Sequence, residues 1–129
     1  MDEKTTLTDI RRRVAQFVAA RDWEQFHTPK NLSNAIAIEA SELMECFLWL
    51  TDAEAKAAPN DAEKRDAIID ELADVMIYSL SMANAMGIDI SAAIRGKLAR
   101  NEHRFPPEMW RGRARVPKNS EEIQSELEK

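Results

Sequence analysis

A length of 129 residues and a mass of 14.7 kDa allow one domain with a single hydrophobic core. Only 3 Gly and 5 Pro, against 44% hydrophobic and 32% charged residues, favour helices over strands. The net charge of −5 argues against binding of a nucleic-acid polymer, although it permits binding of one small nucleotide.

The sequence carries no disulfide, secretion or membrane signal. Cys46 is the single cysteine, which excludes a disulfide framework and suits a reducing compartment. The N-terminal residues MDEKTTLTD lack the apolar core of a signal peptide. The longest uncharged stretch, residues 75–88, is shorter than the roughly 20 residues that cross a bilayer. We therefore expect a cytoplasmic protein with no membrane partner.

The first predicted element is a helix over about residues 8–21, where apolar side chains recur at helical spacing. Thr6 or Thr8 is positioned to cap it. Residues 22–30 break the pattern, and Pro29 disfavours a helical residue before it. An ordered loop is expected there.

The second predicted helix is capped by Asn31 or Ser33 and runs to about Leu50. A polar, Ala-rich connection follows over residues 51–61, with room for one helical turn.

The third predicted helix spans about residues 62–86 and stops at Gly87, a suitable residue just past a helix end. Asp89 or Ser91 caps a fourth helix, which runs to about His103 before two prolines terminate it.

These elements predict an all-α fold with a four-helix unit over residues 1–110 and a mobile tail over residues 111–129. The third helix is apolar around nearly its whole circumference, which a single four-helix unit of this length can hardly bury. We therefore expect an oligomer with sites at or near subunit contacts.

Two pairs of carboxylates stand out, Glu39 with Glu42 and Glu71 with Asp74. A spacing of three residues places each pair on one helix face. Chance alone gives about four such pairs in this composition, but these two lie among apolar neighbours, where acids need a partner or a metal. On antiparallel helices the pairs would supply four oxygen ligands for Mg²⁺. Glu45 extends the stripe as a further ligand or a supporting group.

The carboxylates have two other interpretations. A solvated acidic face on an ordinary helical bundle remains open. Di-iron chemistry requires Glu-x-x-His on two helices, and neither His27 nor His103 completes that motif. The di-iron interpretation therefore fails.

Aromatic and cationic residues share the predicted faces. Trp49 follows Glu42 by seven residues, and Tyr78 follows Glu71 by the same interval, so each falls about two turns along the same stripe. A row of polar side chains marks the fourth helix: Lys97, Asn101 and Arg104. Acids, cations and rings together match a metal, phosphates and a base, although packing and a solvated helix face also account for the rings and cations. No Walker loop and no GxSxG motif occurs, which excludes P-loop and serine-hydrolase chemistry.

These motifs resemble a known family. Glu39-x-x-Glu42 followed by Glu71-x-x-Asp74 resembles the ExxE…ExxD signature of the MazG-like, all-α nucleotide pyrophosphohydrolases. Several segments are similar to the dCTP pyrophosphatase branch: WEQFH at 23–27, Asn31, the Glu-rich helix ending in Trp49, DVMIYS at 74–79 and KLARNEHRFP at 97–106. The similarity covers about residues 7–110.

The resemblance implies Mg²⁺-dependent hydrolysis of a deoxynucleoside triphosphate, dCTP or a modified dCTP, to the monophosphate and pyrophosphate. It implies four metal ligands, Glu39, Glu42, Glu71 and Asp74, of which Glu39 also orients or deprotonates the attacking water. It further implies that Lys97 and Asn101 hold phosphates or sugar. The base pocket would be formed by Trp23, His27, Trp49 and Tyr78. A homodimer or homotetramer is expected from the same resemblance.

Two rivals come from other functional classes. A non-catalytic helical interaction module would bind divalent ions weakly and turn over no nucleotide. A degenerate family member would bind nucleotide as a sensor, and the intact set of four acids argues against it.

Overall fold

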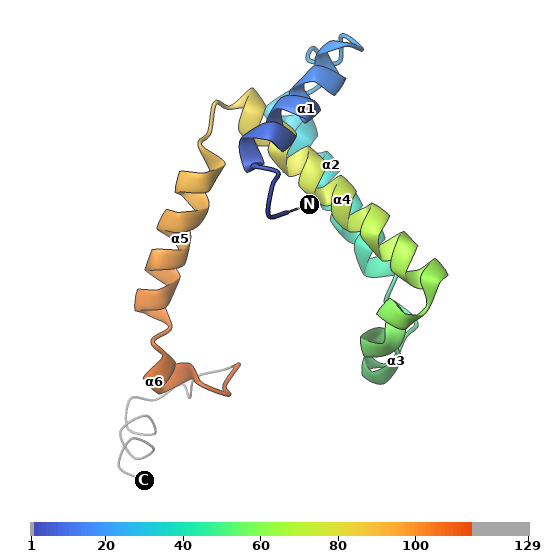
Figure 1. The fold of residues 1–129 in the computed structure, drawn as a ribbon, viewed down its shortest axis with the longest axis vertical. Coiled ribbons are helices and arrows are strands. Elements are labelled where there is room, and N and C mark those ends of the chain that lie inside the picture. Colours follow the sequence, from blue (N-terminus) through green and yellow to red (C-terminus); the bar gives the residue numbers. More distant parts are fainter. Residues whose placement is uncertain (1, 115–129) are drawn as a thin grey trace. The chain divides into compact units, whose positions relative to one another are not determined.

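The computed structural model describes residues 2–114, and all regular secondary structure within them is helical (Figure 1). The all-α prediction is therefore confirmed. The elements are α1 (Leu7–Ala19), α2 (Pro29–Glu45), α3 (Asp52–Ala57), the 3₁₀ helix η1 (Ala58–Asn60), α4 (Ala62–Ala85), α5 (Ile90–Arg104) and α6 (Pro107–Trp110). They fall into two compact units that divide between Ile90 and Ser91.

α1 begins at a reciprocal cap between Thr6 and Asp9. The Thr6 hydroxyl oxygen accepts a hydrogen bond from the Asp9 backbone N–H at 3.1 Å, and the Asp9 carboxylate accepts one from the Thr6 N–H at 3.1 Å. This capping box satisfies two backbone donors that the first turn leaves free. The helix turns Val14 and Val18 into the protein interior.

α1 ends two residues earlier than predicted. Asp22 adopts the left-handed conformation, with φ 53°, and the Trp23 N–H donates back to the Val18 carbonyl at 3.1 Å. Asp tolerates that conformation better than most residues, so the helix closes there without a glycine.

α2 begins earlier than predicted, and the assignment of Asn31 or Ser33 as its cap is wrong. Thr28 is the cap, and its hydroxyl oxygen accepts a hydrogen bond from the Asn31 N–H at 3.2 Å. Pro29 occupies the first helical position, where its missing N–H costs nothing and its fixed φ fits the helix. The proline therefore starts the helix and does not belong to the preceding loop.

α2 also ends five residues before the predicted Leu50. After Glu45 the chain tightens into turns in which Phe47 and Leu48 donate to carbonyls three residues earlier, at 3.0 and 3.2 Å. Thr51 then caps α3 with a second capping box. Trp49 consequently lies outside the helix that carries Glu42.

α2 and α4 form the central antiparallel pair of the first unit, and α1 packs against α4 (Figure 1). Asp61 caps α4, accepting a hydrogen bond from the Lys64 N–H at 3.1 Å. Gly87, at φ 62°, takes the left-handed conformation just past its end, as predicted. The buried apolar side chains are few: Val14, Val18, Leu32, Ala58, Leu80 and Ala83.

The second unit contains α5, the fourth long helix of the prediction, and the short α6, which was not predicted. A T-shaped contact between Phe105 and Trp110, with centroids 4.8 Å apart, folds α6 back on the end of α5. The two units part between residues 90 and 91, and the predicted domain over residues 1–110 stays a prediction. Most of the predicted tail, residues 115–129, lies outside the described residues.

No single helix within residues 2–114 has the length and hydropathy to cross a bilayer. α4 and α5 meet that test only when they are taken together across the break between them.

Leu32 provides a test of the α2 packing, because it is the largest side chain that is fully buried, with 1% of its surface exposed. We expect Leu32→Ala to lower the free energy of unfolding by about 2–5 kcal/mol through lost burial and the cavity left behind. Urea unfolding at a fixed protein concentration measures this. Lys30→Ala, an exposed change in the first turn of the same helix, should stay within about 0.5 kcal/mol of wild type. Equal effects of the two variants would contradict the packing described.

Candidate active site

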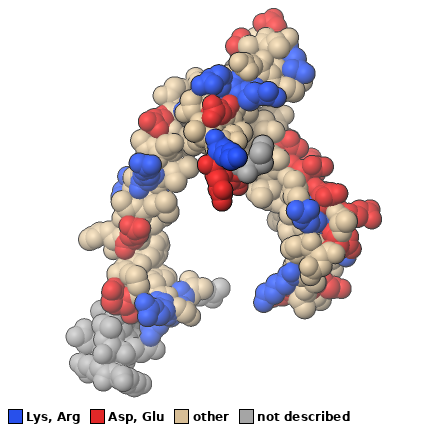
Figure 2. All heavy atoms as spheres, viewed as in Figure 1, with Lys and Arg blue, Asp and Glu red and all other residues tan. Residues whose placement is uncertain are grey.

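Three carboxylates from the two central helices meet in the first unit. Glu39 and Glu42 of α2 and Glu71 of α4 each offer one oxygen, and these oxygens all lie within 4.8 Å of one another. The three-residue spacing points Glu39 and Glu42 to one side of α2, and the packing of α2 on α4 brings Glu71 opposite them. Figure 2 shows Asp and Glu side chains gathered along the part of the first unit that α2, α3 and α4 form.

The carboxylates of this cluster destabilise one another's charged forms. Desolvation raises the pKa of Glu39, and the negative charges of Glu42, Asp74 and Glu71 raise it further. Desolvation also raises the pKa of Glu71, followed by the charges of Glu42, Asp74 and Asp70. The Oε2 atom of Glu71 is buried and has no hydrogen-bond partner within residues 2–114. A cation bound between the helices would relieve both the repulsion and the unpaired oxygen.

Asp74 lies at the border of the cluster. Its charge acts on Glu39 and Glu71, yet none of its oxygens belongs to the group within 4.8 Å. Glu45 is exposed at the last residue of α2. The structure therefore brings three of the four predicted metal ligands into one site and leaves the fourth beside it.

The donor set of this cluster fits a hard divalent cation. Carboxylate oxygens are the ligands that Mg²⁺ prefers, and it usually retains waters or substrate phosphates in its remaining positions. The partly exposed cluster, in which Glu42 is exposed while Glu39 and Glu71 are half-buried, leaves room for such ligands.

Three of the predicted base-pocket residues form a row of rings beside α4. The Trp23 and His27 rings lie 6.4 Å apart between centroids, and the His27 and Tyr78 rings lie 6.2 Å apart. Tyr78 follows Asp74 by four residues on α4, one helical turn from the acids. The row therefore extends from the carboxylates into the loop that precedes α2.

Trp49 is not part of this row of rings. Because α2 ends at Glu45, the expectation that Trp49 continues the Glu42 stripe is wrong, and 89% of its surface is exposed. Lys97 and Asn101 lie on α5 in the second unit, so their predicted contact with phosphate or sugar stays a prediction.

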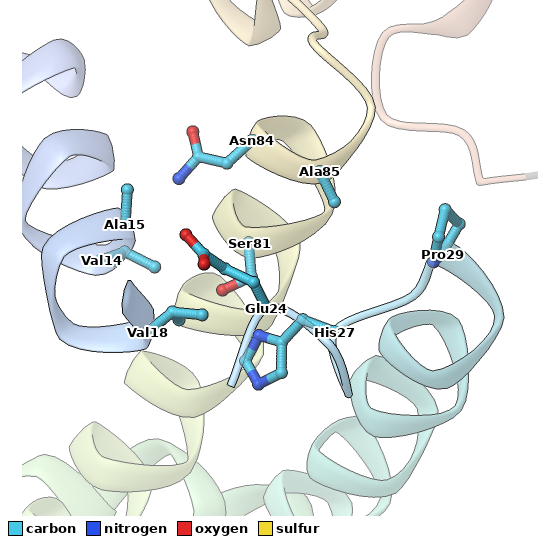
Figure 3. A pocket seen from close by; sticks show the side chains of 9 residues that line it. All are labelled: Val14, Ala15, Val18, Glu24, His27, Pro29, Ser81, Asn84 and Ala85. Atoms are coloured by element: carbon cyan, nitrogen blue, oxygen red, sulfur yellow. The ribbon is translucent and has the colours of Figure 1, made fainter. Parts of the chain in front are cut away.

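A pocket of about 400 Å³ opens between α1, the loop before α2 and the C-terminal part of α4 (Figure 3). Its lining combines apolar and polar side chains: Val14, Ala15, Val18, Glu24, His27, Pro29, Ser81, Asn84 and Ala85. Of these, only His27 was predicted from sequence to take part in the site. The pocket therefore adds residues of α1 and of the end of α4 to the candidate site.

One sequence signal for this pocket was available. Ser81 is a polar residue in an apolar stretch of α4, and it follows Asp74 by seven residues, or about two turns. The contribution of α1 had no such signal, because Val14 and Val18 have the pattern of ordinary core residues.

Facing helices that share clustered acids, with a row of rings and a pocket nearby, define an all-helical protein with a candidate metal-dependent site. The sequence pattern of the MazG-like family matches residues 34–112, and the chain belongs to this family.

Known relatives and a solved structure are similar to the chain. dCTP pyrophosphatase 1 of Rattus norvegicus is 43% identical over 84% of this chain and 64% of its own length. For dCTP pyrophosphatase 1 of Homo sapiens the identity is 42% over 85% of this chain and 65% of the relative. The match thus spans slightly less than two thirds of these relatives. A crystal structure of a pyrophosphatase from Archaeoglobus fulgidus matches with a TM-score of 0.72 and 31% sequence identity, covering 78% of this chain and 92% of that chain.

The raised pKa values of Glu39 and Glu71 predict a pH dependence of stability in EDTA. An acid whose pKa is raised by folding binds more protons in the folded chain, so lowering the pH through that pKa toward its ordinary value of 4.5 stabilises the fold. We expect Glu71→Gln to be more stable than wild type at pH 7, and this advantage to shrink as the pH falls. Thermal unfolding from pH 7 to pH 5 measures the difference.

The exposed Asp66→Asn variant on the same helix is the control, and its difference from wild type should lack this trend. A Glu71→Gln advantage that stays constant or grows as the pH falls would refute the repulsion in the cluster.

Proposed function

We propose that this protein is a divalent-metal-dependent nucleoside triphosphate pyrophosphohydrolase that cleaves between the α- and β-phosphates. The observation that carries the proposal is the group of three carboxylates shared by α2 and α4, with one buried Glu71 oxygen that has no hydrogen-bond partner within residues 2–114. Membership of the MazG-like family and the similarity to dCTP pyrophosphatase 1 support it. We assign Mg²⁺ as the cofactor because all the clustered donors are carboxylate oxygens.

We assign a separate role in the reaction to each group of site residues. Glu39, Glu42, Glu71 and Asp74 would hold the ion, which when bound neutralises the charge that grows on the phosphates. Glu39 orients the attacking water and accepts its proton. The raised pKa of Glu39 brings the carboxylate closer to the pH at which a general base is most effective. Lys97 and Asn101 bind the phosphates or the sugar.

We assign dCTP or a modified dCTP as the preferred substrate. Trp23, His27 and Tyr78 offer flat surfaces in a row of rings that reaches the pocket at His27, and stacking on such rings stabilises any base by roughly 1–3 kcal/mol. Discrimination therefore depends on hydrogen bonds to the base edge. The exposed Trp49 is assigned to the base pocket through the assembled oligomer.

Turnover provides the direct test. With Mg²⁺, wild type should convert dCTP to dCMP and pyrophosphate, faster than it converts dTTP, dATP or dGTP, and EDTA should abolish the reaction. Glu39→Gln should lower kcat by about 100-fold or more, because it removes the general base and one ligand. Asp74→Asn should also be strongly impaired.

Glu63→Gln, an exposed change in the first turn of α4, is the matched control and should retain wild-type kcat. Release of orthophosphate, or full activity in EDTA, would exclude this mechanism. Weak metal binding without any turnover would favour a helical interaction module.

The first unit exposes apolar side chains that a soluble chain normally buries. Ile69, Leu72 and Met76 lie on one face of α4 and are 45%, 50% and 49% exposed. Contiguous exposed apolar surface of this kind marks an interface. We propose that the partner is a second copy of this chain, in a dimer or a tetramer, within a reducing cytoplasm that keeps Cys46 a free thiol.

Light scattering measures the assembly. Wild type at micromolar concentration should have at least twice the 14.7 kDa mass of the chain, and Met76→Glu should shift it toward the monomer, because a charge would be buried in the interface. Lys30→Glu, also a charge change at an exposed helical position, should leave the mass unchanged. A stable, active monomer of wild type would disprove the oligomer.

A further inference from the structure

The pocket between α1 and α4 contains polar atoms that the fold does not use. Ser81 is only 5% exposed, and its hydroxyl oxygen has no hydrogen-bond partner within the described residues. The Nδ1 atom of His27, which also lines this pocket, is buried without a partner as well. A buried polar atom left unpaired lowers stability, so both atoms are suited to a ligand that completes their hydrogen bonds.

A second serine on the same helix shows that Ser81 is unusual. The Ser79 hydroxyl donates to the Val75 carbonyl at 2.7 Å, the ordinary way for a helical serine to satisfy itself. Ser81, two residues later, makes no such bond and lines the pocket instead. Both serines belong to α4, so the difference in their hydrogen bonding comes from their surroundings, and Ser81 lines the pocket.

The other two polar side chains of the pocket differ in availability. The Asn84 amide is fully engaged with Arg11 of α1: its oxygen accepts from Arg11 Nε at 3.0 Å, and its nitrogen donates to the Arg11 carbonyl at 3.1 Å. The Glu24 carboxylate makes no hydrogen bond or ion pair with the rest of residues 2–114. Figure 3 shows it between the valines of α1 and Ser81. Asn84 therefore links α4 to α1 at the side of the pocket. The Glu24 and Ser81 side chains are available to a ligand.

The position of the pocket relative to the acids suits one nucleotide. Ser81 lies seven residues beyond Asp74 on α4, about 10 Å along the helix axis and on nearly the same face. Tyr78 and His27 bridge this interval with their rings. A nucleotide with its phosphates at the carboxylates would span a similar length through its sugar to the far edge of its base.

We infer that Glu24 and Ser81 read the edge of an amino-bearing pyrimidine in this pocket, with Glu24 as the specificity-determining residue and Ser81 as a residue that adds affinity. The inference rests on the proposed function and adds to it the residues that recognise the base. Val14 and Val18 supply the apolar wall against which a flat base packs.

The chemistry of the two side chains favours cytosine over uracil or thymine. A carboxylate accepts hydrogen bonds and donates none, so Glu24 pairs with the exocyclic amino group of cytosine and repels the carbonyl that replaces it in uracil. The Ser81 hydroxyl donates to the neighbouring ring nitrogen of cytosine. By rotating it also accepts from the N–H of uracil, so it adds affinity more than discrimination.

Binding of nucleosides without phosphates separates this inference from turnover. NMR titration of the protein in EDTA with deoxycytidine and deoxyuridine should show a preference for deoxycytidine. Glu24→Gln should lower the ratio of the deoxyuridine Kd to the deoxycytidine Kd by about 10-fold or more, because an amide can also donate a hydrogen bond to the uracil carbonyl. Ser81→Ala should weaken deoxycytidine binding by about 3- to 10-fold and raise KM for dCTP with little change in kcat. Because its hydroxyl is unpaired, Ser81→Ala should not lower the Tm.

Ser79→Ala is the matched control and should leave nucleoside affinity and KM unchanged, since Ser79 bonds only to its own helix. An unchanged preference in Glu24→Gln, equal affinities in Ser81→Ala and Ser79→Ala, or a wild type that binds neither nucleoside would each overturn the inference. If Glu24→Gln alters the nucleoside preference and Ser81→Ala weakens deoxycytidine binding, but dCTP is not hydrolysed, the proposed reaction fails and the pocket assignment stands. If dCTP is hydrolysed, but the preference in Glu24→Gln and the deoxycytidine affinity in Ser81→Ala are unchanged, the pocket assignment fails and the proposed reaction stands.

Discussion

The packing of α2 on α4 holds like charges together at the centre of the first unit. The packing of these two helices places Glu39 and Glu42 opposite Glu71. The raised pKa values of Glu39 and Glu71 reflect the unfavourable free energy of that arrangement. Charges that repel one another before a ligand binds are typical of functional sites. A bound cation relieves the repulsion, and the free energy that is released strengthens its binding.

The same packing explains why the candidate site is distributed along α4. The acids lie near the middle of this helix, the ring of Tyr78 lies one turn further, and Ser81 lies at the wall of the pocket. α1 and the loop before α2 complete the pocket by bringing Val14 and His27 against the same helix. One rigid helix thus sets the spacing between the groups assigned to phosphate chemistry and the groups assigned to the base, which a flexible loop would not hold.

Exposed apolar surface connects the fold to its proposed assembly. The first unit buries few apolar side chains and leaves a face of α4 open to solvent, where Leu72 is half exposed. A helix that is apolar around most of its circumference needs neighbours on each side, and α1 and α2 cover only part of α4. A second copy would bury the remaining surface and bring further groups, Trp49 among them, toward a site.

The sequence by itself determined the helical fold, the length of α4 and its stop at Gly87, because hydrophobic spacing and glycine conformation act locally. It also singled out Glu39, Glu42 and Glu71, since acids in apolar helices need partners. Thr28 before Pro29 is a local start signal for α2 that the prediction missed. Only the tertiary structure decided that Asp74 lies at the border of the cluster. Apart from the polar Ser81 in its apolar stretch, the pocket could not be predicted from the sequence. Its walls come from segments far apart in the chain, and no local pattern records which side chains long-range packing brings together.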